Sequence, residues 1–231
     1  KTVNWAPITF NIITDGTFNF KRYPMPADYP AKMAQIARKL PYRLPGLDFY
    51  IYSGDLQGIE DPLIHQIYLL PHSPHEYNSE RVVDVPIVDL GLTAQHNASN
   101  KPRALVIGER LFAKEYLTEA EENDINQAIA DLLTARGITD VDFVKHPNAP
   151  TNAVPQPWYT LIDTQDPVEI RLMEQHYDVV IASVSTALMT ARMLCPTTTE
   201  VISVGLERCA GRKKTVQEVE KAFRGLGVIL I

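Results

Sequence analysis

The sequence contains only two cysteines, Cys195 and Cys209, and lacks the dense cysteine spacing of a disulfide-stabilised secreted domain. Both are therefore predicted to be reduced thiols in a cytosolic protein. No apolar run is long enough to span a membrane, and the chain does not start with the charged and then apolar segments of a secretory signal. The formal net charge of −6 argues against general nucleic-acid binding. We therefore expect a cytoplasmic protein with no nucleic-acid partner.

Two common phosphate-binding patterns are also missing. The sequence has neither a Gly-x-Gly-x-x-Gly fingerprint nor a Walker loop, so dinucleotide-binding and P-loop functions are not expected. Three histidines lie close together in the sequence, at His65, His72 and His75. Their spacing and number fall short of a metal-ligand set, and no cysteine supports them. We expect surface or substrate-lining histidines there, with neither a metal nor a cofactor.

The second half of the chain shows a regular alternation of strand and helix patterns. Strands are expected at 104–107, 141–144, 158–162, 179–181, 201–204 and 228–231. Helices are expected at 118–137, 167–176, 187–194 and 216–223. The first of these helices opens with the capping-box spacing of Thr118 and Glu121 and closes at Gly137. Alternating units of this length predict an α/β fold with a parallel sheet, and a complete Rossmann-like domain over 101–231.

The first 100 residues are organised differently. The apolar runs predicted there are 8–14, 47–52, 63–70 and 82–88, and the one clear helix is 29–40. The polar segment 95–103 contains Pro102 and is typical of a linker. We therefore expect a partial Rossmann-like domain over 1–100. The first residue is lysine, as in a fragment or a processed product.

His146 lies at the end of a predicted strand. The strand 141–144 runs into His146 and Pro147, and it must stop there because proline cannot donate a hydrogen bond to a sheet ladder. In open parallel sheets, ligands bind outside the carboxyl ends of the strands. His146 is therefore a candidate catalytic residue with Pro147 beside it, and a loop histidine without a catalytic role is the simpler alternative.

A group of hydroxyl side chains lies between the strand 179–181 and the helix 187–194. Serine and threonine at a helix start are ordinary N-caps. They also place hydroxyls beside free backbone N–H groups, where a phosphate binds well. The candidates for nucleotide or phosphate binding are Ser183, Ser185, Thr186 and also Gly108, which ends the strand 104–107.

Three motifs in a fixed order carry a resemblance to a known family. They are Thr14-Asp15-Gly16, Lys145-His146-Pro147-Asn148 and Ala182-Ser183-Val184-Ser185-Thr186. In these motifs the sequence resembles the bacterial sialyltransferases, in particular the lipooligosaccharide sialyltransferases and capsule polysialyltransferases. That family has an acidic-acidic-Gly motif, a His-Pro motif and a Ser-Ser/Thr motif, and Thr14 stands here at the first acidic position. The resemblance implies a GT-B fold, with two Rossmann-like domains facing a cleft and the first of them incomplete in this chain.

The resemblance also implies a reaction. It is the inverting, metal-independent transfer of sialic acid from CMP-sialic acid to a bacterial surface glycan such as lipooligosaccharide or capsule. Asp15 would be the general base on the acceptor hydroxyl, and His146 the general acid or cationic stabiliser at the departing phosphate. Ser185 and Thr186 would bind that phosphate, with Ser183 as a helper. The partners implied are a nucleotide-sugar donor and a glycan acceptor.

Several alternatives remain open at this point. The donor could be another CMP-activated acidic sugar such as CMP-Kdo, or the chain could be a non-catalytic module that binds nucleotide or glycan. Asp140-Val-Asp142 spells the Asp-x-Asp of metal-dependent transferases, but it lies at the start of its strand and is interpreted as structural. Six basic residues form either a solvated surface or a candidate contact to an anionic ligand or to the inner membrane. They are Arg208, Arg212, Lys213, Lys214, Lys221 and Arg224.

Overall fold

The computed structural model describes residues 9–13, 37–38, 59, 61–71, 73, 75–85, 101–113, 116–149, 154–164, 166–210 and 214–231. The chain divides into two compact units, the first made of Lys1–Leu69 with His75–Val85 and the second of Leu70–Pro74 with Pro86–Ile231. Of the predicted helix 29–40 only residues 37–38 are described, and they are helical. The predicted strand 47–52 and the predicted domain boundary at residue 100 lie outside the described residues.

The first unit contains a three-stranded parallel sheet in the order β1-β2-β3. Its elements are β1 (Phe10–Ile13), β2 (Ile64–Leu69), the short 3-10 helix η2 (Ser79–Arg81) and β3 (Val82–Asp84). A small apolar core belongs to this unit and consists of Ile59, Ile67, Leu69 and Tyr77. The apolar runs predicted at 8–14, 63–70 and 82–88 therefore correspond to strands.

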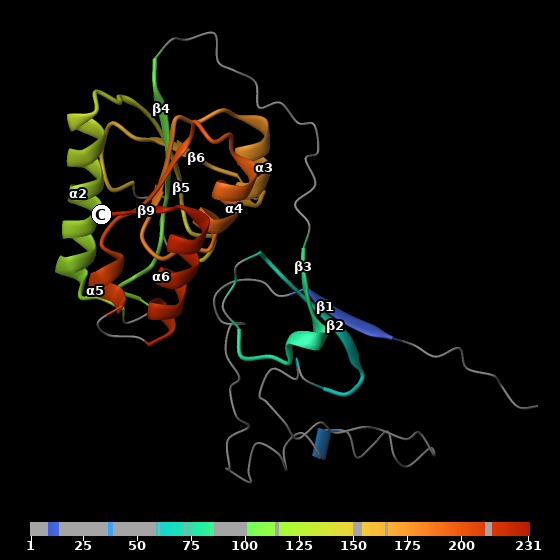
Figure 1. Cartoon of the computed structure of the whole chain (residues 1–231). Helices are drawn as coiled ribbons and strands as arrows, with labels where there is room; N and C mark the ends of the chain where they lie inside the picture. The colour runs from blue at the N-terminus through green and yellow to red at the C-terminus, as the bar shows by residue number, and fades with distance from the viewer. Residues whose placement is uncertain are drawn as a thin grey trace, which may run out of the picture. The chain divides into compact units, whose positions relative to one another are not determined.

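The second unit contains a six-stranded sheet in which all neighbours are parallel (Figure 1). Its strands are β4 (Arg103–Ile107), β5 (Asp140–Val144), β6 (Thr160–Ile162), β7 (Val179–Ala182), β8 (Glu200–Ser203) and β9 (Ile229–Leu230). The order across the sheet is β6-β5-β4-β7-β8-β9. Counted along the chain this is 3-2-1-4-5-6, the Rossmann order, with a topological switch point between β4 and β7. The predicted α/β fold class is confirmed.

The helices described in this unit, α5 excepted, lie close to where the sequence predicts them. They are α2 (Glu119–Ala135), α3 (Val168–Glu174), α4 (Ala187–Leu194), α5 (Leu206–Ala210) and α6 (Lys214–Leu226). The capping box of α2 is confirmed, since Thr118 Oγ1 accepts from the Glu121 N–H and the Glu121 carboxylate accepts from the Thr118 N–H. Gly137 follows α2 with a φ of +68°, which glycine adopts without strain. Helix α5 was not predicted, because five residues are too few to show a periodicity.

The sheet is covered on both faces. Helix α2 lies on one side of it, and α3, α4 and α6 pack next to one another on the other (Figure 1). Right-handed crossovers require this arrangement, because β4–α2–β5 and β7–α4–β8 run in opposite directions across the sheet. The central strands are buried on both faces and are apolar throughout 104–107 and 179–182.

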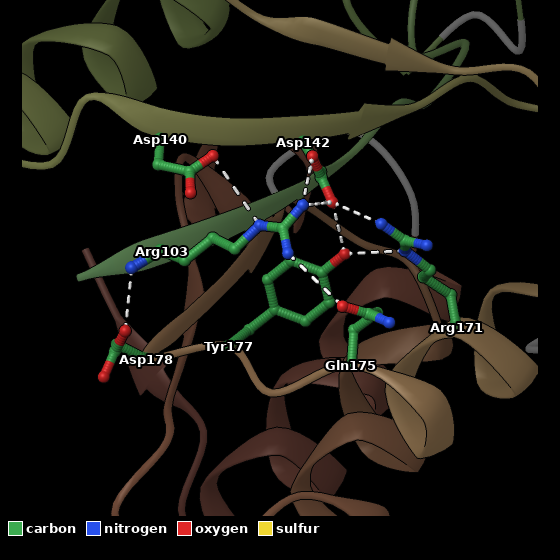
Figure 2. A network of polar contacts seen from close by, with 7 residues as sticks. All are labelled: Arg103, Asp140, Asp142, Arg171, Gln175, Tyr177 and Asp178. Carbon is green, nitrogen blue, oxygen red and sulfur yellow. Dashed lines mark hydrogen bonds and ion pairs between the residues drawn. The ribbon is translucent and has the colours of Figure 1, made fainter. Parts of the chain in front are cut away.

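A buried polar network ties the amino-terminal edge of the sheet to the segment after α3 (Figure 2). The Asp142 carboxylate, whose side chain is 2% exposed, accepts from Arg103 Nη2 at 2.9 Å and 3.1 Å and from Arg171 Nη2 at 2.9 Å. The Tyr177 hydroxyl also donates to Asp142, and Arg171 Nε donates to that hydroxyl at 2.9 Å. Arg103 lies over the Tyr177 ring, 5.4 Å from its centroid. Strands β4 and β5 and helix α3 are thereby connected through one carboxylate.

The charges in this network are mutually compensated. Burial, together with the hydrogen bond to the Asp142 carboxylate, raises the pKa of Tyr177 above its usual value of 10.0, so the phenol stays protonated and remains a donor. The backbone N–H of Arg103 donates to Asp178 at 2.7 Å, and Arg103 Nη1 donates to Gln175 at 3.3 Å (Figure 2). The interactions of the buried carboxylate with two guanidinium groups and a phenol donor offset most of the free energy that its desolvation costs.

Replacing Asp142 by asparagine should lower the free energy of unfolding by about 3–5 kcal/mol, because two partly buried guanidinium groups then lose their counter-charge. Asp140 on the same strand is the matched control. Its side chain is 46% exposed and its ion pair with Arg103 is 3.6 Å long, so Asp140→Asn should change the free energy by no more than about 1 kcal/mol. Urea unfolding measures both values, and equal effects of the two substitutions would contradict the assignment.

Candidate functional site

The switch point between β4 and β7 is where the fold itself leaves a crevice. The connection from β4 passes over one face of the sheet to β5, while the connection from β7 passes over the other face to β8. The two loops therefore diverge at the carboxyl ends of β4 and β7, and ligands of open α/β sheets bind in this place. The predicted site residues Gly108 and Ser183 each directly follow one of these two strands.

Gly108 occupies a position where a side chain would displace its neighbours. A Cβ atom built on it would lie 2.7 Å from Cζ of Phe143 and 3.1 Å from the carbonyl oxygen of Val144. Its backbone N–H donates to that same carbonyl at 2.7 Å, which extends the pairing of β4 with β5. The amide of Gly108 is therefore used within the sheet, and its contribution at the crevice is the space that the missing side chain leaves.

Ser183 is buried, with 1% of its surface exposed. Its hydroxyl donates to the carbonyl of Val204, and its own carbonyl accepts from the Ser203 hydroxyl. These two bonds join the ends of β7 and β8. The structure therefore places the Ser183 hydroxyl inside the protein, bonded to the neighbouring strand.

Glu109 crosses the crevice from β4 to the start of the β7–α4 turn. Its carboxylate accepts from the backbone N–H groups of both Ser183 and Val184, with distances to the Val184 nitrogen of 3.0 Å and 3.2 Å. This residue was missed in the sequence. The only signal there is an acidic residue directly after the glycine that ends the first strand of a βαβ unit, and this signal does not say which amides the carboxylate meets.

Ser185 and Thr186 come next in the turn and are half-buried. The Ser185 hydroxyl accepts weakly from the Ala187 N–H at 3.3 Å, and the Thr186 side chain makes no capping bond. Among the described residues, no acceptor contacts the backbone N–H of Ser185 or Thr186. Two hydroxyls and two backbone donors at the start of α4 are thus available to an anion.

His146 follows β5 at the same edge of the sheet and is half-buried, and Pro147 beside it is exposed. Nδ1 of His146 accepts from the backbone N–H of Asn148 at 3.1 Å. Since Nδ1 is the acceptor, the neutral ring carries its proton on Nε2. Strands β5 and β7 flank β4 on either side, which places their ends about 10 Å apart. The imidazole and the hydroxyl pair thus belong to one edge of one sheet.

A pocket opens beside this edge, between the end of β4 and helix α2. It encloses about 310 Å³, counting the space that is open to solvent. Its apolar floor includes Ile125, Ile129 and Phe143. Its polar lining consists of Gly108, Glu109, Glu122, Asn126 and Ser183. The structure therefore groups two predicted site residues, Gly108 and Ser183, with Glu109.

Other predicted features fall outside this group. Asp15 lies outside the described residues, so its position relative to His146 stays a prediction. Asp142 of the Asp-x-Asp sequence is enclosed by Arg103 and Arg171, which agrees with a structural role. Of the clustered histidines, His72 is not described, His65 is exposed, and His75 stacks on Tyr77. In the described ranges, no group of three or more His, Cys, Asp or Glu is placed to hold a metal ion.

The basic C-terminal residues are partly matched by acids. Lys221 pairs with Glu218 at 3.3 Å and Arg224 with Glu220 at 2.8 Å, while Arg208 lies 3.9 Å from Asp124. Residues 211–213 are not described. Among the helices that the structure describes, none is both long and apolar enough to cross a membrane. Contact with the inner membrane stays a prediction.

The burial of the Ser183 hydroxyl leads to a stability prediction. Ser183→Ala leaves the buried Val204 carbonyl without its side-chain donor and should lower the free energy of unfolding by about 1–3 kcal/mol. Thr198→Ala removes an exposed hydroxyl and should change it by less than about 0.5 kcal/mol. Urea unfolding of the two variants tests the difference, and a Ser183→Ala chain as stable as the parent would show that the hydroxyl is not needed at the β7–β8 junction.

Comparison with known proteins identifies a family whose model matches this chain. The family model described as alpha-2,8-polysialyltransferase (POLYST) matches residues 70–204, which is more than half of the chain and includes His146 and the β7–α4 turn. No curated protein matches the sequence. Among solved structures, S. aureus homoserine dehydrogenase is similar at 18% identity and a TM-score of 0.27, over 57% of this chain and 33% of that one.

The family match confirms the resemblance that the His-Pro and Ser-x-Ser-Thr motifs indicate, and both motifs fall within the matched residues. Because the match extends over more than half of the sequence, the chain belongs to the alpha-2,8-polysialyltransferase family, a family of glycosyltransferases.

Proposed function

We propose that the protein is a sialyltransferase that moves sialic acid from CMP-sialic acid to a glycan of the bacterial surface. One observation supports this most directly. Within the family-matched residues, His146 and the open donors of Ser185 and Thr186 lie at the same carboxyl edge of a Rossmann-like sheet. An imidazole and a row of hydrogen-bond donors that follow strands whose ends lie about 10 Å apart can approach a phosphate from two sides.

The donor phosphate is bound at the start of α4. The hydroxyls of Ser185 and Thr186 and their backbone N–H groups donate to its oxygens, and the positive end of the helix favours its charge. Hydrogen bonds from ionised or strongly polar groups to phosphate are short and strong. Ser183 contributes by fixing the turn, because its hydroxyl is bonded to Val204.

His146 acts on the leaving group. As the bond between the anomeric carbon and the phosphate oxygen breaks, its electron pair goes to that oxygen, and CMP departs. Protonated Nε2 of His146 donates to this oxygen and stabilises the developing charge. The bond from the backbone N–H of Asn148 to Nδ1 leaves Nε2 as the nitrogen that carries the proton of the neutral ring. No metal is required if the Nε2–H of His146 and the α4 donors together stabilise the charge on the phosphate.

Asp15 acts on the acceptor. Its carboxylate takes the proton of the acceptor hydroxyl while the oxygen of that hydroxyl forms the new bond to the anomeric carbon. Attack from the face opposite to CMP inverts the anomeric configuration. This assignment rests on the Thr14-Asp15-Gly16 motif alone and requires the two units to face each other across a cleft, as in a GT-B enzyme.

Asp15→Ala and His146→Ala should each reduce sialic acid transfer by about 10²–10⁴-fold, the usual contribution of a general acid or base. The measurement is CMP release from CMP-sialic acid in the presence of lipooligosaccharide or oligosialic acid acceptors, with CMP-Kdo as the competing donor. His65→Ala is the matched control, because His65 is exposed on β2 and has no assigned role.

Transfer at the parental rate in either variant would refute the assigned roles. Preferential use of CMP-Kdo would change the donor, and binding of CMP without turnover of any acceptor would indicate a binding module.

The phosphate assignment makes a separate prediction. Replacing both Ser185 and Thr186 by alanine should weaken CMP binding about ten-fold or more, because two donors to a charged group are lost. Thr197→Ala with Thr198→Ala is the matched pair, since these exposed hydroxyls lie at the other end of α4. Calorimetric titration with CMP measures the change, and equal affinities for the two double variants would rule out the phosphate role.

A further inference from the structure

Helix α2 turns one stripe of side chains toward the sheet, and this stripe changes in character along the helix. Its later positions are apolar and buried, with Ile129 4% and Leu133 0% exposed. Its first two turns contribute Glu122 and Asn126 to the lining of the pocket beside β4. Residues four positions apart share one face of a helix, so two polar side chains lie on a stripe that is otherwise apolar. Polar groups in such a place need hydrogen-bond partners.

Asn126 has no such partner within the described residues. Its side chain is half-buried, and its amide makes no hydrogen bond with any of them. Glu122 differs, because one of its carboxylate oxygens accepts from the backbone N–H of Phe112 at 2.6 Å. A side-chain amide has two N–H donors and a carbonyl acceptor. Asn126 therefore offers a donor and an acceptor to a ligand, beside an apolar wall that includes Ile125 and Ile129.

The pocket does not suit the charged groups of a sugar nucleotide. The described residues that line it include no lysine, arginine or histidine. Its ionisable side chains are the carboxylates of Glu109 and Glu122. A phosphate or a sugar carboxylate would find no cationic partner in this lining, and burying a charge without a partner is unfavourable. The ligand group that fits the pocket is therefore an uncharged one.

The pocket adjoins the proposed phosphate site. Its lining includes Ser183, which lies only two residues before Ser185 in the β7–α4 turn. Two residues of chain span at most about 7 Å. The sugar of the donor is bonded directly to the phosphate, so a substituent on the far side of the sugar ring reaches the pocket when the phosphate lies at the start of α4.

We propose that Asn126 is a specificity-determining residue that selects a donor sugar with an acetamido group over one with a hydroxyl at the same position. The acetamido group of sialic acid is uncharged and combines a carbonyl acceptor, an N–H donor and a methyl group. The Asn126 amide donates to the carbonyl, and the methyl group packs against Ile125 and Ile129. This role rests on the proposed function, because it assumes that the donor phosphate binds at the start of α4.

The test measures transfer by the 231-residue chain to one fixed acceptor from two donors. They are CMP-sialic acid and its analogue with a hydroxyl in place of the acetamido group. The parent chain should use CMP-sialic acid with a kcat/KM about ten-fold or more higher, because the analogue leaves the Asn126 amide unpaired. Asn126→Leu has a similar size without polar atoms, and it should narrow this ratio to about two-fold. Its affinity for CMP, measured by calorimetric titration, should stay within about two-fold of the parent, because CMP lacks the sugar.

Asn123→Leu is the matched control, since it makes the same change on the same helix. Asn123 is exposed and does not line the pocket. Its replacement should leave the ratio of the two donors within about two-fold of the parent. A ratio that changes equally in the Asn123 and Asn126 variants would overturn the role of Asn126 in favour of an indirect effect through helix α2.

The remaining outcomes separate the role of Asn126 from the proposed function. Equal use of the two donors by the parent chain, or a preference for CMP-Kdo, which has no acetamido group, overturns the role without any variant. A parental ratio in a folded Asn126→Leu chain, verified by thermal unfolding, overturns it as well. Weaker CMP binding by Asn126→Leu would place the nucleoside in the pocket and contradict the role. After equal donor use, a parental ratio or weaker CMP binding, sialic acid transfer by the parent keeps the proposed function. A parent chain that neither binds CMP nor transfers sialic acid refutes the proposed function, and the role of Asn126 with it.

Discussion

Parallel pairing of β4 with both β5 and β7 is the constraint on which the second unit depends. Residues 104–107 have no face toward water, so their backbone groups must all be paired with neighbouring strands. Right-handed crossovers then send the two halves of the chain in opposite directions from this centre. The diverging connections leave a crevice at the carboxyl ends of β4 and β7. The polar residues that directly follow these two strands therefore lie beside it.

The polar groups at the two edges of the sheet differ in how completely they are hydrogen-bonded within the protein. At the amino edge, Asp142 is enclosed by two arginines and a tyrosine hydroxyl, so the network is complete and holds the strands together (Figure 2). At the carboxyl edge, the Glu109 carboxylate satisfies two backbone donors, while the donors of Ser185 and Thr186 stay open. A saturated network suits structure and an unsaturated one suits binding, and this difference supports placing the donor phosphate at α4.

Sequence patterns predicted the second unit well because its elements are long, apolar and clearly bounded. The capping box at Thr118, the proline after His146 and the glycine after α2 are local signals, and each fixed a boundary within one or two residues. The same reasoning missed α5, which has five residues, and did not reveal that the Ser183 hydroxyl donates to the Val204 carbonyl. A local sequence motif does not show whether a side chain will be buried against a neighbouring strand.

The sequence alone determined the α/β class, the strands and helices of the second half and the family, because these depend on periodicity and on motifs that survive in the order of the residues. Only the tertiary structure decided that Glu109 binds the amides of Ser183 and Val184, that Asp142 is enclosed by two arginines, and that Nδ1 of His146 is bonded within its own loop. Each of these depends on which groups meet at a strand end. Residues 74 positions apart in the chain meet there only because β4 and β7 are neighbours in the sheet.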